Sequence, residues 1–239
     1  MMVQRDPVIV ALDCSENERL LYLADILRGE VETVKVGLEA FSHMGPGIID
    51  MLRDSGYRVF VDLKLHDIPH TVSGAVAALV RRGAGMLTVH TSGGRAMLEA
   101  AAEAVKREAD AAGIAPPLLL GVTVLTSLDD ADLTEIGWSA RSEETVLSLA
   151  ELGMQAGLDG VVASPHEVAA LRAVLGQEAV IVTPGIRPEG GDAHDQARMA
   201  TPREALSAGA DFLVIGRPII AQGDPLAALR DMRRTAGLL

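Results

Sequence analysis

The sequence predicts an α/β protein that folds as a single (β/α)8 TIM barrel over residues 1–239. Eight aliphatic runs of strand length alternate with segments in which apolar residues recur at helical spacing. The runs are almost continuously apolar, which is typical of parallel strands covered by helices. Strand–helix units that repeat at intervals of roughly 20–30 residues fit one closed barrel of ordinary size.

Each expected strand is an aliphatic run that stops at a polar residue, a glycine or a proline. In chain order the expected strands are residues 8–13, 33–37, 59–65, 85–90, 118–125, 160–163, 179–182 and 212–216. The first is typical, because its apolar residues from Val8 to Leu12 lead into a single acid, Asp13. The third alternates, so that Val59 and Val61 share one face while Phe60 points to the other.

The segments between the strands carry helical patterns and helix-stop signals. In the first of them Leu20, Leu23, Ala24 and Leu27 recur at helical spacing, and Gly29 ends the helix. The expected helices are residues 16–28, 43–54, 70–82, 93–112, segments within 129–155, 165–175, 202–208 and two short helices at the C-terminus. No linker, low-complexity run or change of composition divides the chain, so we expect one domain.

A doubly wound open sheet is the alternative arrangement of parallel strands and helices. Its dinucleotide-binding form carries a G-x-G-x-x-G motif directly after the first strand, and this chain has none there. The barrel is therefore the preferred fold class, and dinucleotide binding loses support.

Composition and charge limit the partners of the protein. The net charge of −12 disfavours nucleic acid and anionic membranes, so an anionic ligand would require a local cationic site. Cys14 is the single cysteine, which rules out an internal disulfide and fits a reducing compartment. The N-terminal residues lack the apolar region of a signal peptide, and no apolar run has membrane-spanning length. We therefore expect a cytoplasmic protein.

The third strand carries the most informative charges in the chain. Its period of two places Asp62 and Lys64 on one face, and Asp67 follows just beyond the strand, before Pro69. An ammonium close to two carboxylates is unusual in an apolar core, which makes the group a candidate functional site. The alternative is a satisfied ion pair that caps the strand.

Lysine is rare in this chain. The 21 Lys+Arg include only three lysines, Lys35, Lys64 and Lys106, and the first two lie in strand-like apolar runs. Arginine keeps its proton at neutral pH, whereas an ammonium can donate one. The use of lysine at two strand positions therefore indicates a need for ammonium chemistry or for a compact charge.

In a (β/α)8 barrel the active site lies at the C-terminal ends of the strands. The polar residues expected there are Asp13, Lys35, Asp62, Lys64, His90, Thr126, Ser127, Ser164 and Arg217. The loop after the seventh strand runs from Thr183 to Arg198 and contains Arg187 and Gln196. Roughly 16 residues is long for a loop of this kind, which favours a lid over an unstructured surface loop.

Gly216, Arg217 and Pro218 follow the eighth strand and lead into a short helix. Backbone N–H groups at the start of a helix, together with one guanidinium, match the charge and geometry of a phosphate. Phosphate sites are frequent at this position of a barrel. The sequence therefore predicts phosphate binding at Gly216 and Arg217.

Five segments spread over nearly the whole chain carry a resemblance to a known family. They are residues 11–13 (ALD), 34–37 (VKVG), 62–69 (DLKLHDIP), 122–127 (VTVLTS), and the pair 183–188 (TPGIRP) with 215–218 (IGRP). Together they closely resemble the bacterial orotidine 5′-phosphate decarboxylases. The Asp-x-Lys-x-x-Asp core is shared with a wider superfamily. The lysine before Gly37, the Leu-Thr-Ser loop and the Pro-Gly-Ile-Arg lid with Gln196 are more specific.

The resemblance implies a homodimer without cofactor or metal that converts the small molecule orotidine 5′-phosphate to UMP, the last step of UMP biosynthesis. It implies that Lys64 donates a proton to the pyrimidine carbon that loses carbon dioxide, and that Asp62 lies against the substrate carboxylate. Asp67 would enter from the partner subunit and complete a charge array with Lys35, Asp62 and Lys64. The sites would form at the subunit interface.

The resemblance also implies which residues bind the rest of the substrate. Asp13 and Lys35 would hold the ribose hydroxyls, with Thr71 of the partner subunit. The residues implied at the pyrimidine are Thr126 and Ser127, and those implied at the phosphate are Arg187, Gln196, Gly216 and Arg217.

Two alternatives to this function remain. One is a metal-dependent decarboxylase or epimerase of sugar phosphates on the same barrel core, in which Asp62, Asp67 and His66 would bind a divalent cation. Lysines beside a cation would repel it, which argues against this alternative. The other is an inactive barrel that binds a nucleotide phosphate as a sensor or scaffold, although every expected catalytic position is filled.

Overall fold

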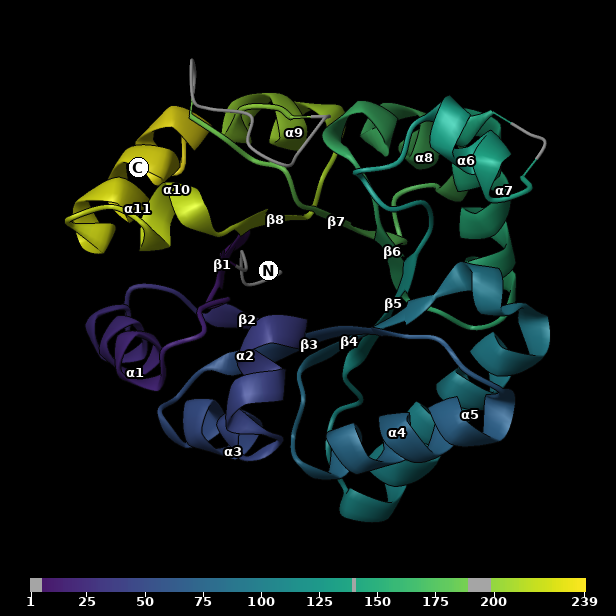
Figure 1. The fold of residues 1–239 in the computed structure, drawn as a ribbon, viewed down its shortest axis with the longest axis horizontal. Coiled ribbons are helices and arrows are strands. Elements are labelled where there is room, and N and C mark those ends of the chain that lie inside the picture. Colours follow the sequence, from purple (N-terminus) through teal and green to yellow (C-terminus); the bar gives the residue numbers. More distant parts are fainter. Residues whose placement is uncertain (1–5, 139–140, 189–198) are drawn as a thin grey trace.

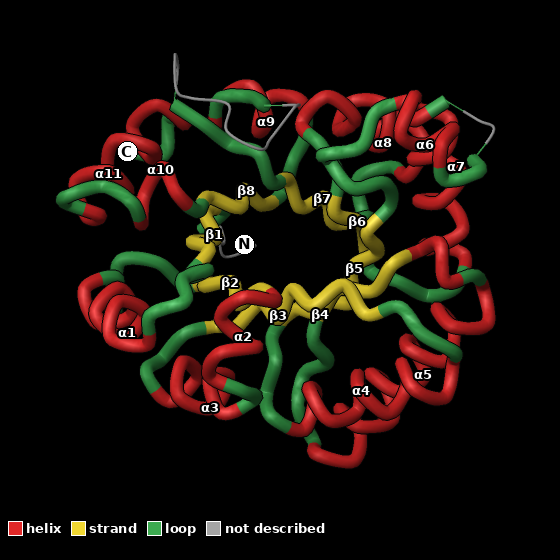
Figure 2. The backbone as a smooth tube through the Cα atoms, viewed as in Figure 1, coloured by secondary structure: helices red, strands yellow, loops and turns green. Residues whose placement is uncertain are grey.

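The computed structural model describes residues 6–138, 141–188 and 199–239, which form a closed barrel of parallel strands in sequence order. The strands make a central ring and the helices surround it (Figure 1 and Figure 2). The strands are β1 (Val8–Ala11), β2 (Thr33–Gly37), β3 (Arg58–Leu65), β4 (Met86–His90), β5 (Leu118–Val122), β6 (Gly160–Val162), β7 (Val180–Thr183) and β8 (Phe212–Ile215). The pairing of β8 with β1 closes the ring and confirms the predicted (β/α)8 barrel.

The helices pack on the outer surface of the ring. They are α1 (Asn17–Ile26), α2 (Leu38–Met44), α3 (Gly47–Asp54), α4 (Pro69–Arg81), α5 (Arg95–Ala112), α6 (Asp130–Glu135), α7 (Ser142–Gln155), α8 (Val168–Leu175), α9 (Pro202–Ala208), α10 (Arg217–Ile220) and α11 (Pro225–Ala236). Short 3-10 turns at Thr91–Gly93 and Pro165–Glu167 precede α5 and α8. None of the helices in the described parts of the chain has the length and apolar character needed to cross a membrane.

The largest differences between the expected elements and the structure concern two helices and one strand. The single helix predicted over 43–54 is wrong, because α2 ends at Met44 and α3 begins at Gly47. Gly45 has φ 68°, and Pro46 disfavours helical backbone at the residue before it, so the chain turns here. The fifth strand ends at Val122 and not at residue 125, and the last helix is 12 residues long and not short.

The apolar residues form two layers separated by the strands. The inner layer fills the barrel and consists of Ile9, Ala11, Phe60, Met86, Leu120, Val182, Phe212 and Val214. The outer layer lies between the strands and the helices, and includes Val59 and Val61. The predicted alternation in the third strand is therefore confirmed. Because the same alternation continues along β3, it directs Asp62 to the inside of the barrel at the C-terminal end.

At the N-terminal end of the barrel, two aspartates brace neighbouring strands in the same way. Asp159 accepts the N–H of Leu119 at 2.7 Å and donates its own N–H to the carbonyl of Leu119 at 2.9 Å. Asp211 repeats both hydrogen bonds with Ile181, at 2.7 and 2.9 Å. Arg172 adds a hydrogen bond to the carboxylate of Asp211 at 2.7 Å. The charged groups at this end thus join one strand to the next.

Candidate active site

A cavity of ≈ 470 Å³ opens at the C-terminal ends of the strands. Its walls combine apolar residues of the inner layer with charged residues from several strand ends. The lining residues are Ala11, Asp13, Lys35, Glu39, Phe60, Asp62, Lys64, Thr126, Val162, Pro184, Gly185, Arg187, Val214, Gly216, Arg217 and Ile220. Most of the residues that the sequence singled out therefore lie around one space.

Two lysines and two aspartates form a continuous array on one side of this cavity. Lys64 Nζ lies 3.0 and 2.9 Å from the two carboxylate oxygens of Asp62. Lys35 Nζ lies 3.4 Å from Asp62 Oδ2 and 2.5 Å from Asp13 Oδ2. The Asp62 carboxylate is thus shared between two ammonium groups, and Lys35 joins it to Asp13.

Gly37 fixes the outer end of the array. Its backbone N–H donates to Asp13 Oδ1 at 2.7 Å, so that both oxygens of the carboxylate are engaged. A Cβ atom at position 37 would clash with the carboxylate of Asp13. The absence of a side chain at Gly37 therefore allows the backbone to hold Asp13 in place.

The central groups of the array are almost fully buried. Asp62 is 8% exposed and Lys35 is 7% exposed. Burial raises the pKa of Asp62, but the ammonium groups of Lys35 and Lys64 lower it by more than burial raises it. The pKa of Asp62 therefore lies below its usual value. Burial lowers the pKa of Lys35, but the carboxylates of Asp62 and Asp13 outweigh it and raise this pKa above its usual value. Both groups are therefore charged at neutral pH.

The backbone of Lys64 is strained. Its φ of 51° is the one positive value at a non-glycine residue among the described residues. A left-handed conformation costs a residue with a side chain about 1–2 kcal/mol, so the surroundings must hold it. The ladder between β3 and β4 is irregular here, since Val61 pairs with Leu87 but Leu65 pairs with Val89. Lys64 therefore lies in a bulge of β3, which turns its side chain back over Asp62.

Two arginines, Arg187 after β7 and Arg217 after β8, line the cavity. Arg187 is 8% exposed and donates to the carbonyl of Ile186 at 2.9 Å, while its Nε has no hydrogen-bond partner among the described residues. Burial, and then the positive charge of Arg217, lower the pKa of Arg187. Like charges that are held close together and partly desolvated favour binding of an anion between them.

The structure does not bring every expected residue into this cavity. Asp67 and Thr71 are exposed beyond the end of β3, and Asp67 Oδ1 accepts the N–H of Ile68 at 2.6 Å. Ser127 lies in an exposed turn next to the cavity-lining Thr126. The expected phosphate ligand Gln196 lies outside the described residues. At the base of the same loop, the N–H of Arg187 donates to the carbonyl of Ala200 at 3.0 Å.

Thr88 was not among the site residues expected from the sequence, although it is 1% exposed and hydrogen-bonds to the array. A signal was present, because Met86, Thr88 and His90 alternate along the fourth strand and share its inner face. His90 was expected at the strand ends, and the centroid of its ring lies 5.5 Å from that of His66. Burial, and then the charges of His66 and Lys64, lower the pKa of His90.

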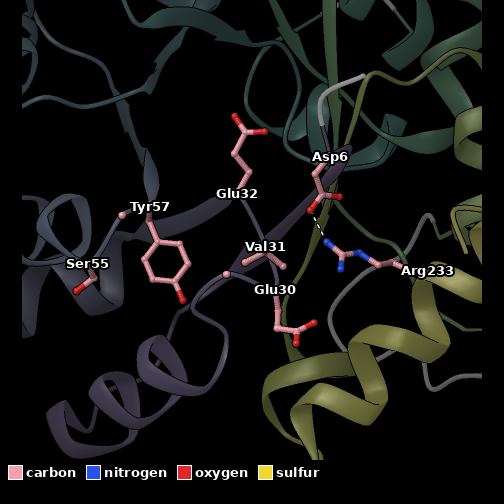
Figure 3. A pocket seen from close by; sticks show the side chains of 9 residues that line it. Asp6, Glu30, Val31, Glu32, Ser55, Tyr57 and Arg233 are labelled. Atoms are coloured by element: carbon pink, nitrogen blue, oxygen red, sulfur yellow. Dashed lines mark hydrogen bonds and ion pairs between the residues drawn. The ribbon is translucent and has the colours of Figure 1, made fainter. Parts of the chain in front are cut away.

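A second cavity, of ≈ 450 Å³, lies at the opposite end of the barrel (Figure 3). Here Asp6 pairs with Arg233 of α11, and the hydroxyl of Tyr57 donates to the carbonyl of Ala24 at 2.6 Å. Burial raises the pKa of Tyr57 to about 12, so this hydroxyl keeps its proton. Within the described parts of the chain, no three metal-ligating side chains converge at this or any other place.

The fold and the C-terminal cavity together define a barrel enzyme, because enzymes of this architecture hold their reacting groups at these strand ends. The chain belongs to the orotidine 5′-phosphate decarboxylase / HUMPS family, whose model matches residues 6–232. It is 53% identical over 230 residues to the orotidine 5′-phosphate decarboxylase of Moorella thermoacetica, covering 96% of this chain and 91% of that protein.

Further relatives agree with this assignment. The orotidine 5′-phosphate decarboxylase of Paramagnetospirillum magneticum is 47% identical over 233 residues, covering 98% of this chain and 99% of that protein. The solved structure of the enzyme of this name from Lactobacillus acidophilus superposes with a TM-score of 0.86 at 39% identity. The superposition covers 96% of this chain and 98% of the Lactobacillus acidophilus chain. The family resemblance expected from the sequence is confirmed.

Proposed function

We propose that this protein decarboxylates orotidine 5′-phosphate to UMP without a cofactor, as the last step of UMP biosynthesis. The observation that carries the proposal is the array of Lys64, Asp62, Lys35 and Asp13, whose central groups are buried and which faces the same cavity as an arginine pair. The names of the relatives, which cover nearly the whole chain, support the same substrate.

Lys64 is the group suited to the chemical step. When the bond between the pyrimidine ring and carbon dioxide breaks, its electron pair stays on the ring carbon, which has no conjugated sink for the charge. An ammonium about 4 Å away stabilises such a charge by up to ~4 kcal/mol at an effective dielectric constant of ~20. The same ammonium then supplies the proton that replaces carbon dioxide on that carbon. Because the array is formed before the substrate arrives, little reorganisation is needed during the reaction.

Asp62 and its neighbours position the charges around the reacting carbon. Asp62 hydrogen-bonds Lys64 through both oxygens and stays ionised because of its lowered pKa, so it would face the substrate carboxylate as an anion. Lys35 and Asp13 lie farther along the array and are suited to bind the ribose hydroxyls. Thr126 lines the cavity and, with Ser127 beside it, is assigned to the pyrimidine.

Arg187 and Arg217, with Gly216, are assigned to the phosphate. The support is the buried guanidinium of Arg187, whose Nε has no partner among the described residues, and the repulsion between the two arginines. A phosphate dianion accepts several charged hydrogen bonds and would relieve that repulsion. Gln196 is assigned to the same phosphate from the segment outside the described residues. Binding energy gained at the phosphate, far from the chemistry, can orient the ring.

The protein is further proposed to act as a cytoplasmic homodimer. Asp67 and Thr71 project from an exposed segment and do not line the cavity of their own chain. Ile68 between them is 66% exposed, which is unusual for a large apolar side chain and is suited to a protein contact. In a dimer with two-fold symmetry, Asp67 and Thr71 of one subunit would complete the site of the other.

The alternative is a metal-dependent enzyme that acts on a sugar phosphate. The arrangement of the donors disfavours it, because Asp62 is bonded to two ammonium groups and both would repel a divalent cation bound there. The proposal is tested by following the absorbance of orotidine 5′-phosphate with purified protein in excess chelator. We expect the absorbance to fall at the same rate with chelator as without it. A protein that is inactive in chelator and recovers with magnesium or zinc would support the alternative.

A further inference from the structure

Thr88 lies in the middle of β4, opposite the bulge in β3. Between the paired positions of the two strands, β3 advances from Val61 to Leu65 while β4 advances only from Leu87 to Val89. Thr88 is the residue between those two β4 positions, and it is 1% exposed. Its side chain therefore faces the stretch of β3 that has no regular ladder partner.

The hydroxyl of Thr88 makes two hydrogen bonds to residues of the bulge, one to a backbone group and one to a side chain. The backbone N–H of Lys64 donates to Thr88 Oγ1 at 2.9 Å. Thr88 Oγ1 in turn donates to Asp62 Oδ1 at 3.0 Å. Since a hydroxyl has one proton and the amide must be the donor, the proton of Thr88 is directed at the carboxylate. One side chain thus connects the backbone of Lys64 with the carboxylate that holds its ammonium.

We propose that Thr88 is a positioning residue for the decarboxylation, which holds the left-handed backbone of Lys64 and orients the Asp62 carboxylate beneath its ammonium. The inference rests on the proposed function and extends it to a residue on a strand that carries none of the assigned catalytic groups. Without the hydroxyl, the amide of Lys64 has no acceptor in the ladder and the strained conformation loses its support. Lys64 Nζ would then no longer be held at the distance and angle that the proton transfer needs.

The hydroxyl also affects the charge on Asp62. A hydrogen bond donated to a carboxylate favours the ionised form, and the bond from Thr88 contributes to the lowered pKa of Asp62. Loss of that bond moves this pKa upward, so the acid limb of the pH–kcat profile moves to higher pH. A purely structural role for Thr88 would not produce this change, because a less stable protein with an intact array keeps its pH profile.

The test compares Thr88→Ser with Thr88→Ala, two variants that both remove the methyl group and differ only in the hydroxyl. We expect Thr88→Ala to lower kcat about 10- to 100-fold with a KM within about threefold of wild type. Thr88→Ser is expected to keep a kcat within about threefold of wild type. The acid limb of its pH–kcat profile should lie at the same pH as in wild type. Thr123→Val is the matched control, since Thr123 is 2% exposed and its Oγ1 has no partner among the described residues.

The outcomes separate the inference from the function on which it rests. Wild-type protein that fails to consume orotidine 5′-phosphate would overturn both. Active wild-type protein with equal kcat values for Thr88→Ser and Thr88→Ala, at equal Tm, would overturn the role of Thr88 alone. A kcat of Thr88→Ala that falls only as far as that of Thr123→Val would do the same. A selective loss in Thr88→Ala, with the shifted acid limb, would establish the role.

Discussion

The two ends of the barrel hold cavities of nearly equal size, ≈ 470 and ≈ 450 Å³, but use their charges differently. At the N-terminal end the charged side chains bond to the backbone of neighbouring strands or pair across the surface, as Asp211 and Arg233 do. At the C-terminal end two lysines share one buried carboxylate, and Arg187 is repelled by Arg217. The first arrangement braces neighbouring strands, whereas the second gathers charged groups around a cavity at the strand ends where barrel enzymes act.

This difference has a thermodynamic consequence. Burying a charge costs free energy that an ion pair only partly returns, so the C-terminal array contributes little net stability. The hydrogen bonds at the N-terminal end satisfy strand N–H groups that would otherwise lose their partners. Asp62 keeps the ammonium of Lys35 when Lys64 is replaced, so that substitution should abolish activity with a smaller loss of stability than replacement of Asp62 itself. Substitutions at the N-terminal end should lower stability and leave activity unchanged.

The largest expected effect is on Lys64. Lys64→Arg should lower kcat by about 10³-fold or more, nearly as far as Lys64→Ala, although it keeps the positive charge. Arginine does not release its proton at neutral pH, and its planar guanidinium is larger than the ammonium that fits over Asp62. The measurement is single-turnover decarboxylation, with Tm as the check on folding. An arginine variant within tenfold of wild type would leave Lys64 an electrostatic role only.

The exposed position of Asp67 allows a second test of the C-terminal end. Homodimers of Lys64→Ala and of Asp67→Asn should each be nearly inactive. Mixing them with subunit exchange should restore about a quarter of wild-type activity, because about half of the dimers are then hybrids with one intact site in two. Mass labelling measures the exchange independently. Complete exchange without recovered activity would mean that Asp67 serves the site of its own chain.

Arg217→Ala should raise KM for orotidine 5′-phosphate about 10- to 100-fold, the loss expected for a charged hydrogen bond to phosphate. The slow reaction of the nucleoside orotidine, which lacks the phosphate, should hardly change. Arg230→Ala is a matched control, because Arg230 pairs with Glu30 beside the opposite cavity at 3.4 Å. Equal losses on both substrates would show that Arg217 supports the fold or the chemistry instead.

The N-terminal end should show the opposite behaviour. Asp211→Ala removes the acceptor of the Ile181 N–H and one partner of Arg172. The expected cost is about 1–3 kcal/mol in the free energy of unfolding, or a decrease in Tm of roughly 2–10 °C, with kcat unchanged. Asp211→Asn keeps an acceptor oxygen and should lose less. A large fall in kcat at normal Tm would contradict the division between the two ends.

Much of this division could be predicted from the sequence, because strand position and side-chain alternation are local properties. The aliphatic runs gave the strands, and the alternation placed Asp62 on the inner face with Phe60. The break at Gly45 was missed, since the periodicity alone continues across it. Thr88 was also missed, because its two hydrogen bonds depend on a bulge in a neighbouring strand. The register between strands and the left-handed backbone of Lys64 are properties of the assembled sheet.

The smallest expected effect concerns His90, at the C-terminal end of β4. Burial, then His66 and Lys64, lower its pKa, while Asp62 opposes them, so the net shift favours the neutral ring in the folded state. A group with a lowered folded-state pKa contributes fully above its unfolded pKa, about 6.5 for histidine, and this contribution is lost as the pH falls through the folded-state pKa.

Wild-type stability should therefore fall as the pH is lowered below about 6.5, and His90→Gln should remove part of that fall. The measurement is the free energy of unfolding by denaturant at several pH values between about 5 and 8, where histidine titrates. His43→Gln is the control for the loss of an imidazole, because His43 is exposed on α2. Equal slopes for wild type and His90→Gln would show that the buried ring adds no pH dependence. The acid sensitivity would then have to come from groups outside the end of β4.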